Sequence, residues 1–118
     1  MSNRRISAIG LAFAALAGCA NDPAPNEQMR LTEQAVAQAK AIGATEQVAE
    51  MQLAEQKLAR AQKNMNEEDY KRARVFAEQA ELDARLAEAR VLTQKSQEQL
   101  TELNLRITRL RKQLRDLQ

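Results

Sequence analysis

The sequence predicts an all-α protein, a helical hairpin with a weaker N-terminal helix and a long, coiled-coil-like C-terminal helix. Three observations favour this fold class. No proline follows Pro25, and the chain is rich in Ala, Gln, Glu, Arg and Leu, which are strong helix formers. Apolar residues recur at alternating spacings of three and four. The chain has no Trp, one Tyr and two Phe, so it cannot fill a thick globular core and suits long, thin helical packing.

The first 18 residues have the features of a secretory signal. Arg4 and Arg5 precede an apolar run, 6–16, that is too short to span a bilayer. The following residues, Leu16, Ala17, Gly18 and Cys19, resemble the lipobox of bacterial lipoproteins. That resemblance implies cleavage after Gly18, a diacylglycerol on the Cys19 sulfur and acylation of the new amino terminus. The alternative is an ordinary cleaved signal with a stray cysteine.

The mature chain is expected to be neutral and to face the periplasm. Removal of residues 1–18 takes away Arg4 and Arg5 and leaves 16 basic and 16 acidic residues, so no net field attracts nucleic acid. In lipoproteins of two-membrane bacteria, an aspartate directly after the cysteine is the usual signal for retention in the inner membrane. Ala20 occupies that place, which predicts an anchor in the outer membrane. In a single-membrane bacterium the same anchor would lie at the cell surface.

Residues 19–26 are expected to form a lipidated, flexible tether, and residues 27–118 one helical domain. Both prolines, Pro23 and Pro25, lie in the tether. Asn26 is a candidate N-cap for a first helix that ends near Ile42. Its weakly apolar stripe comprises Met29, Thr32, Val36 and Ala39. Gly43 is either a C-cap or a tolerated glycine inside one long kinked helix over 27–64, which would bring Arg106 near Glu27.

A second helix is expected from Thr45 or Glu46 to about Asn64. Its apolar positions have the spacing of a helix that packs on a helix, and they are Met51, Ala54, Leu58, Ala61 and Met65. The turn over 64–69 predicts a new helix capped by Asn66, with Asp69 at its third position in the manner of a capping box.

The third helix is expected to run from this turn to about Leu117 and to carry two stripes on nearly opposite faces. One is small, and it comprises Tyr70, Ala73, Ala77, Ala80, Ala84, Ala87 and Val91. The other is bulkier, and it comprises Val75, Gln79, Leu82, Leu86, Ala89, Thr93, Ser96, Leu100, Leu103, Ile107, Leu110, Leu114 and Leu117. The first half of this helix can therefore be sandwiched between two partners. The second helix, returning antiparallel, is the simplest partner for the alanine face.

The segment 54–91 carries a family resemblance. The residues that carry it are Ala54, Lys57, Leu58, Ala61, Asp69, Tyr70, Ala73, Arg74, the run 77–80 and the run 83–89. They resemble the bacterial lipoproteins that share the domain of unknown function 4398 (DUF4398), over residues 30–115. Some relatives continue into a peptidoglycan-binding domain, which implies proximity to peptidoglycan. Residues 66–69 replace the glycine that usually precedes the tyrosine, and the resemblance implies no known activity.

Catalysis, metal binding and cofactor binding are not predicted. There is no histidine, and the single cysteine is expected to be acylated. The densest acidic cluster is Glu67, Glu68 and Asp69. Acids in the first turn of a helix complement its dipole, and no further ligands converge on them. We expect this cluster to cap a helix.

The C-terminal part of the third helix is the candidate interaction surface. Its apolar stripe comprises Leu100, Leu103, Ile107, Leu110, Leu114 and Leu117, the leucine seam, and Arg106 and Arg111 flank it. With Leu100 at position a of a heptad, Arg106 falls at g and Arg111 at e, where a parallel homodimer would bring them together as like charges. The expected partners are an antiparallel second copy, the first helix or a foreign helix with acidic flanks.

We therefore expect a non-enzymatic envelope lipoprotein that acts as a structural or helix-packing adaptor. The alternative is a regulatory or assembly partner of a larger envelope complex, such as efflux or cell-wall machinery. That partner would dock through the basic, leucine-rich end of the third helix. The expected contacts are a membrane, through the lipid anchor, and another helical envelope protein or a second copy.

Overall fold

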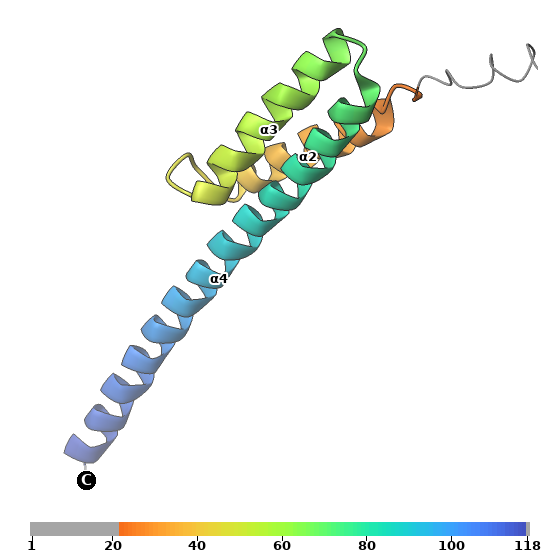
Figure 1. The fold of residues 1–118 in the computed structure, drawn as a ribbon. Coiled ribbons are helices and arrows are strands. Elements are labelled where there is room, and N and C mark those ends of the chain that lie inside the picture. The colour runs from red at the N-terminus through yellow and green to blue at the C-terminus, as the bar shows by residue number, and fades with distance from the viewer. Residues whose placement is uncertain (1–21, 118) are drawn as a thin grey trace, which may run out of the picture.

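The computed structural model describes residues 22–117, and three helices account for most of this range. They are α2 (Asn26–Ala41), α3 (Ala49–Asn66) and α4 (Tyr70–Asp116). Figure 1 shows α2 and α3 alongside the first half of α4, while its second half projects beyond them. The predicted all-α class, with its hairpin and long last helix, is confirmed.

The helices run up, down and up. The side-chain hydrogen bonds between α2 and α4 follow the same order along both helices, since Gln28 bonds to Glu81 and Gln38 to Glu88. By contrast, Lys57 and Glu50 of α3 reach Asp83 and Arg90 of α4 in reverse order. Thus α2 is parallel to α4, and α3 is antiparallel to both.

The core is built on the alanine face of α4. The buried residues of α4 all come from the predicted small stripe: Ala73, Ala77, Ala80, Ala84, Ala87 and Val91. The buried residues of α2 and α3 that face them are Met29, Thr32, Ala35, Val36, Ala39, Met51, Ala54 and Ala61. Because the alanine side chain is small, the helix backbones can approach closely. Met51 and Thr32 are the largest fully buried side chains in this core.

The chain's own described helices cover only one of the two apolar faces of α4. Both α2 and α3 pack on its alanine face, so within residues 22–117 no helix covers the opposite face. Val75, Leu82 and Leu86 on that face are all exposed. One face is sufficient because α2 and α3 also touch each other, through the Lys40–Glu55 ion pair of 2.6 Å among other contacts.

Polar contacts between helices surround this thin core. Thr32 is wholly buried, and its hydroxyl oxygen lies 2.9 Å from the backbone carbonyl of Ala77, to which it donates. Lys57 Nζ lies 2.6 Å from Asp83 Oδ2, and Arg90 pairs with Glu50 at 2.5 Å. These two ion pairs are consistent with the antiparallel order in which α3 meets α4.

The connection between α2 and α3 excludes a single long kinked helix over 27–64. Gly43 has a φ of 104°. Its N–H donates to the carbonyl of Lys40, and the N–H of Ala44 donates to the carbonyl of Ala39. This is the Schellman arrangement, with glycine in the left-handed position, and the buried Ala44 packs in the same cluster as Ala39. Glu27 accordingly pairs with Arg30 and lies on a different part of the molecule from Arg106.

The expected start of the second helix is three to four residues too early. The N–H of Val48 donates to the carbonyl of Thr45, so a tight turn occupies these positions and α3 begins at Ala49. Similarly, Asn26 is the first residue of α2 and is not its cap. The buried Pro25 precedes it, and its carbonyl accepts from the N–H of Met29.

The expected cap of the last helix is also displaced. Asn66 is the final residue of α3, and Asp69 is the N-cap of α4, because its Oδ1 accepts from the N–H of Arg72 at 3.1 Å. Sequence reasoning identified the turn and its acidic residue but placed the helix start three residues early. From Tyr70, α4 continues for 47 residues, about 70 Å at 1.5 Å per residue.

Candidate interaction surface

The leucine seam lies on the part of α4 that projects beyond the other helices. Its six residues are all exposed, from 37% for Ile107 to 84% for Leu117. Arg106 and Arg111, which flank it, are also exposed. The structure therefore places the predicted interaction residues Leu100, Leu103, Ile107, Leu110, Leu114, Arg106 and Arg111 together along one free stretch of helix.

This stretch is free because α2 and α3 end before they reach it. The furthest hydrogen bond from α4 to this region is made by Lys95, whose Nζ donates to the carbonyl of Ile42 at 2.6 Å. Within residues 22–117, no side-chain hydrogen bond or ion pair joins α2 or α3 to any later residue of α4. The first helix is therefore not the partner of the leucine seam, and this one of the three expected partners is excluded.

The exposed apolar face is longer than the seam alone. Val75, Leu82 and Leu86 continue the same spacing toward the start of α4 and are 44%, 67% and 52% exposed. We call the nine exposed residues of this face the α4 stripe: Val75, Leu82, Leu86, Leu100, Leu103, Ile107, Leu110, Leu114 and Leu117. Sequence reasoning found all nine from their periodicity but did not include the first three in the interaction surface.

The charges beside the seam are mostly basic. Arg106 forms an ion pair with Glu102 one turn earlier. Among residues 22–117, no acidic side chain comes within ion-pair distance of Arg109, Arg111 or Arg115. A partner for this end of α4 would therefore gain from carboxylates at its flanks.

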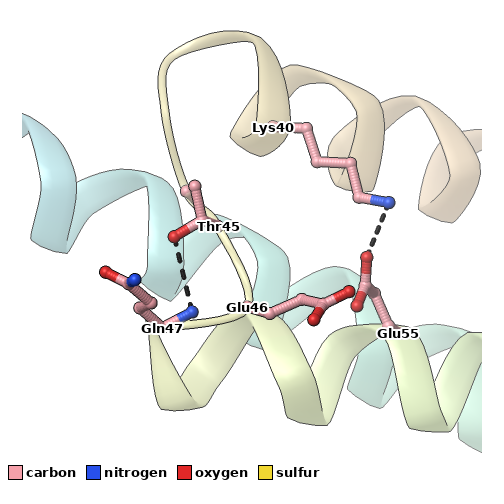
Figure 2. Close-up of a pocket in the computed structure, with 6 residues that line it drawn as sticks. Lys40, Thr45, Glu46, Gln47 and Glu55 are labelled. Atoms are coloured by element: carbon pink, nitrogen blue, oxygen red, sulfur yellow. Dashed lines mark hydrogen bonds and ion pairs between the residues drawn. The ribbon is translucent and has the colours of Figure 1, made fainter.

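A surface depression lies by the α2–α3 connection, and its lining shows no arrangement typical of a catalytic site. Figure 2 shows its lining, in which Lys40 pairs with Glu55 at 2.6 Å and Thr45 accepts from the backbone N–H of Gln47. These contacts stabilise the turn before α3. In the described part of the chain, no group of three or more acidic, histidine or cysteine residues could hold a metal ion.

The acidic cluster at the α3–α4 turn has a structural role. Asp69 caps α4, and Glu67 lies 3.8 Å from Lys63 in the last turn of α3. Glu68 has a φ of 60°, so its backbone makes the turn itself. The capping interpretation is therefore confirmed for Asp69 alone, because Glu67 and Glu68 lie at the C-terminal end of α3 and not in the first turn of α4.

The predicted lipobox lies outside the described residues: Leu16, Ala17, Gly18 and the lipidation site, Cys19. The described chain begins at Asp22, three residues before the buried Pro25 at the start of α2. Within residues 22–117, no helix is both long enough and apolar enough to cross a bilayer.

Two comparisons relate this architecture to known proteins. The family described as "Domain of unknown function (DUF4398)" matches residues 27–103, which include α2, α3 and the first part of α4. A crystal structure of a DUF4398 family protein from Pseudomonas aeruginosa PAO1 has 64% sequence identity and a TM-score of 0.80. The similarity covers 81% of this chain and 100% of that chain. No protein with a curated description matches the sequence.

Proposed function

This chain belongs to the DUF4398 family, and from that premise we propose that it is a non-enzymatic, lipid-anchored envelope protein that acts as a helix-packing adaptor. The observation that carries the proposal is the exposed leucine seam. It stands on a helix that extends well past its own bundle. Isolated amphipathic helices are marginal in water, and an exposed apolar stripe of this length favours a helical partner.

The anchor is the second part of the proposal. The lipobox residues and Cys19 support a diacylglycerol at the start of the mature chain, and Ala20 supports the periplasmic face of the outer membrane. Two or more acyl chains hold a protein firmly to a bilayer, because each buried methylene contributes about 0.8 kcal/mol. The short segment between Cys19 and α2 would keep the bundle close to that membrane.

The adaptor role is tested by changing Leu103 and Leu110 together to Asp in the full chain. We expect this change to abolish crosslinked complexes recovered from cells, because two charges then interrupt the seam. The matched control adds the same two charges on the outer side of the same turns, as Leu105→Asp with Thr108→Asp. Complexes that persist in the seam variant, or are lost equally in the control, would contradict the proposal.

The anchor is tested separately with Cys19→Ser. Incorporation of labelled fatty acid and cleavage of the signal should both be lost, while the helical domain keeps its circular dichroism. Unchanged labelling would remove the anchor from the proposal. The identity of the recovered complex distinguishes the two roles: self-complexes favour a structural role, and a stoichiometric foreign protein favours assembly of a larger machine.

A further inference from the structure

The α4 stripe follows a continuous heptad pattern along nearly the whole helix. With Leu100 at position a, the a and d positions extend back to Val75, and both packed helices lie on the opposite face. The pattern has two strong regions, 75–86, where Gln79 is the polar exception, and 100–117. Between them, the a and d positions hold the small residues Ala89, Thr93 and Ser96. Any occupant of this face must therefore supply bulk opposite the weak middle region.

Charge excludes a parallel second copy. In a parallel pair, position g of one helix meets position e of the next heptad of the other. Along α4, three of these meetings join like charges: Arg106 with Arg111, Arg85 with Arg90, and Glu78 with Asp83. None of the others joins opposite charges. The first of the three is the strongest objection to a parallel pair, because Arg90 and Asp83 already pair with Glu50 and Lys57 of α3.

An antiparallel second copy satisfies both requirements. We propose that two copies of this chain pair along their α4 stripes, antiparallel, with the two-fold axis level with Glu98. This inference rests on the proposed packing role of α4 and names the occupant of its free face. In this register each a residue packs against a d residue of the second copy. The layers on each side of the axis join Ser96 to Leu100, Thr93 to Leu103, Ala89 to Ile107, Leu86 to Leu110, and Leu82 to Leu114.

The register places a large apolar residue in every one of these layers. The small residues of the middle region meet Leu100, Leu103 and Ile107 of the second copy. The leucines of the first strong region meet those at the end of the helix. This complementarity explains why α4 extends so far beyond α2 and α3, since its last turns are needed to cover Leu82 and Leu86 of the second copy.

The flanking charges select this register over its neighbours. In antiparallel pairs, e positions face e positions and g positions face g positions. Arg111 then faces Asp83 of the second copy, a carboxylate that also pairs with Lys57 of its own α3, and this contact occurs twice because of the symmetry. A shift of the two-fold axis by half a heptad in one direction brings Arg106 opposite Arg85. The same shift in the other direction brings Arg111 opposite Arg90.

The experiment uses residues 22–118, a chain that contains no cysteine. The crystallised Pseudomonas protein folds, and its entire length is matched by 81% of this chain. Sedimentation equilibrium at micromolar to millimolar concentration should show a dimer. A monomer at these concentrations would overturn the proposal.

Distances between nitroxide labels then test the register. Labels on Gln99→Cys should lie within about 20 Å of each other, because this site is next to the two-fold axis. Labels on Gln113→Cys should lie about 45 Å apart at 1.5 Å per residue. Short distances at both sites would indicate a parallel pair, and about 25 Å at Gln113 would indicate pairing through the leucine seam alone. Either result would overturn the register proposed here.

The charge contact has its own matched pair of variants. Arg111→Glu should weaken the dimer at least about fivefold, because it replaces two attractive contacts with repulsive ones. Arg109→Glu makes the same change on the outer face and should leave the dimer unchanged. Equal effects of the two variants would contradict the contact between Arg111 and Asp83. Two results together would refute the dimer and leave the adaptor role unchanged. The purified chain would be monomeric, and the variant with Leu103→Asp and Leu110→Asp would lose a foreign partner in cells.

Discussion

Glu68 makes the turn between α3 and α4 in a backbone conformation that favours glycine. Its φ is 60°, its N–H donates to the carbonyl of Met65, and the N–H of Asp69 donates to the carbonyl of Asn64. This is the same Schellman arrangement that Gly43 makes at the end of α2. The two helix ends therefore use the same geometry, but only one of them has the residue that adopts it without strain.

We expect Glu68→Gly to stabilise the protein by about 0.5–1 kcal/mol. A side chain in the left-handed region costs about 1–2 kcal/mol, and glycine loses roughly half of that gain to the entropy of the unfolded chain. Urea unfolding followed by circular dichroism measures the difference. Glu67→Gly is the control, since Glu67 has a negative φ, and it should destabilise or change nothing. A destabilised Glu68→Gly would show that the turn depends on the Glu68 side chain.

Glu81 gives the bundle a dependence on acidity. The hydrogen bond from Gln28 Nε2, at 2.7 Å, and then the guanidinium of Arg85 hold the pKa of this carboxyl below its usual value of 4.5. The unfolded state therefore takes up a proton first as the pH falls. The contribution of Glu81 to stability is complete above about pH 4.5 and is lost as the pH falls through the lowered pKa.

We expect Glu81→Gln to lose this part of the acid sensitivity. Thermal unfolding between pH 6 and pH 3 should show a smaller decrease in melting temperature for the variant than for the natural chain. Glu78→Gln, on the exposed side of α4, should keep the full decrease. Parallel decreases in all three proteins would mean that Glu81 is not the responsible group.

At the scale of the helix, the alanine face determines how closely α2 and α3 approach α4. Ala84 is wholly buried and packs in one cluster with Met51, Ala54 and Val36. We expect Ala84→Leu to destabilise the bundle by about 1–3 kcal/mol, because the added atoms must separate the helices. Arg74→Leu adds a leucine on an exposed position of the same helix and should stay within about 0.5 kcal/mol. Chemical unfolding of both variants measures the contrast, and equal changes would show that the close packing is not limiting.

For the whole molecule, the proposed pairing predicts a dimer only modestly longer than one chain. A single α4 is about 70 Å long. With the two-fold axis level with Glu98, two copies overlap so extensively that the paired helices span about 85 Å. The maximum dimension from small-angle scattering should therefore increase by roughly a fifth on dimerisation. A much greater increase would indicate pairing through the ends of α4 alone.

The same geometry has a consequence for an anchored protein. Gln28, in the first turns of α2, lies beside Glu81 of α4, so the two α2 starts in the dimer would be about 50 Å apart along the helix pair. The two-fold axis can then stand normal to one membrane, with α4 lying along its surface. Both lipid anchors could enter the same leaflet in this arrangement.

The sequence by itself determined the fold class, the two stripes of α4 and the exposed seam, because periodicity and composition are local properties of a helix. The buried stripe from Ala73 to Val91 and the small core of α2 and α3 follow from that spacing. The predicted positions of the helix ends were less accurate. Asn66 and Asp69 are both suitable caps, and only the hydrogen bonds of the folded turn distinguish them. The lipobox and Cys19 stay a prediction from residue pattern alone.

Only the tertiary structure decided which face of α4 the other helices cover. Periodicity shows that a helix has two apolar faces, but it does not show which of them another helix of the same chain will cover. Here α2 and α3 both pack on the alanine face, because its small side chains allow two helices to contact one stripe of α4 and also each other. That choice leaves Val75, Leu82 and Leu86 exposed and continuous with the leucine seam, and so makes the whole length of α4 a surface for another helix.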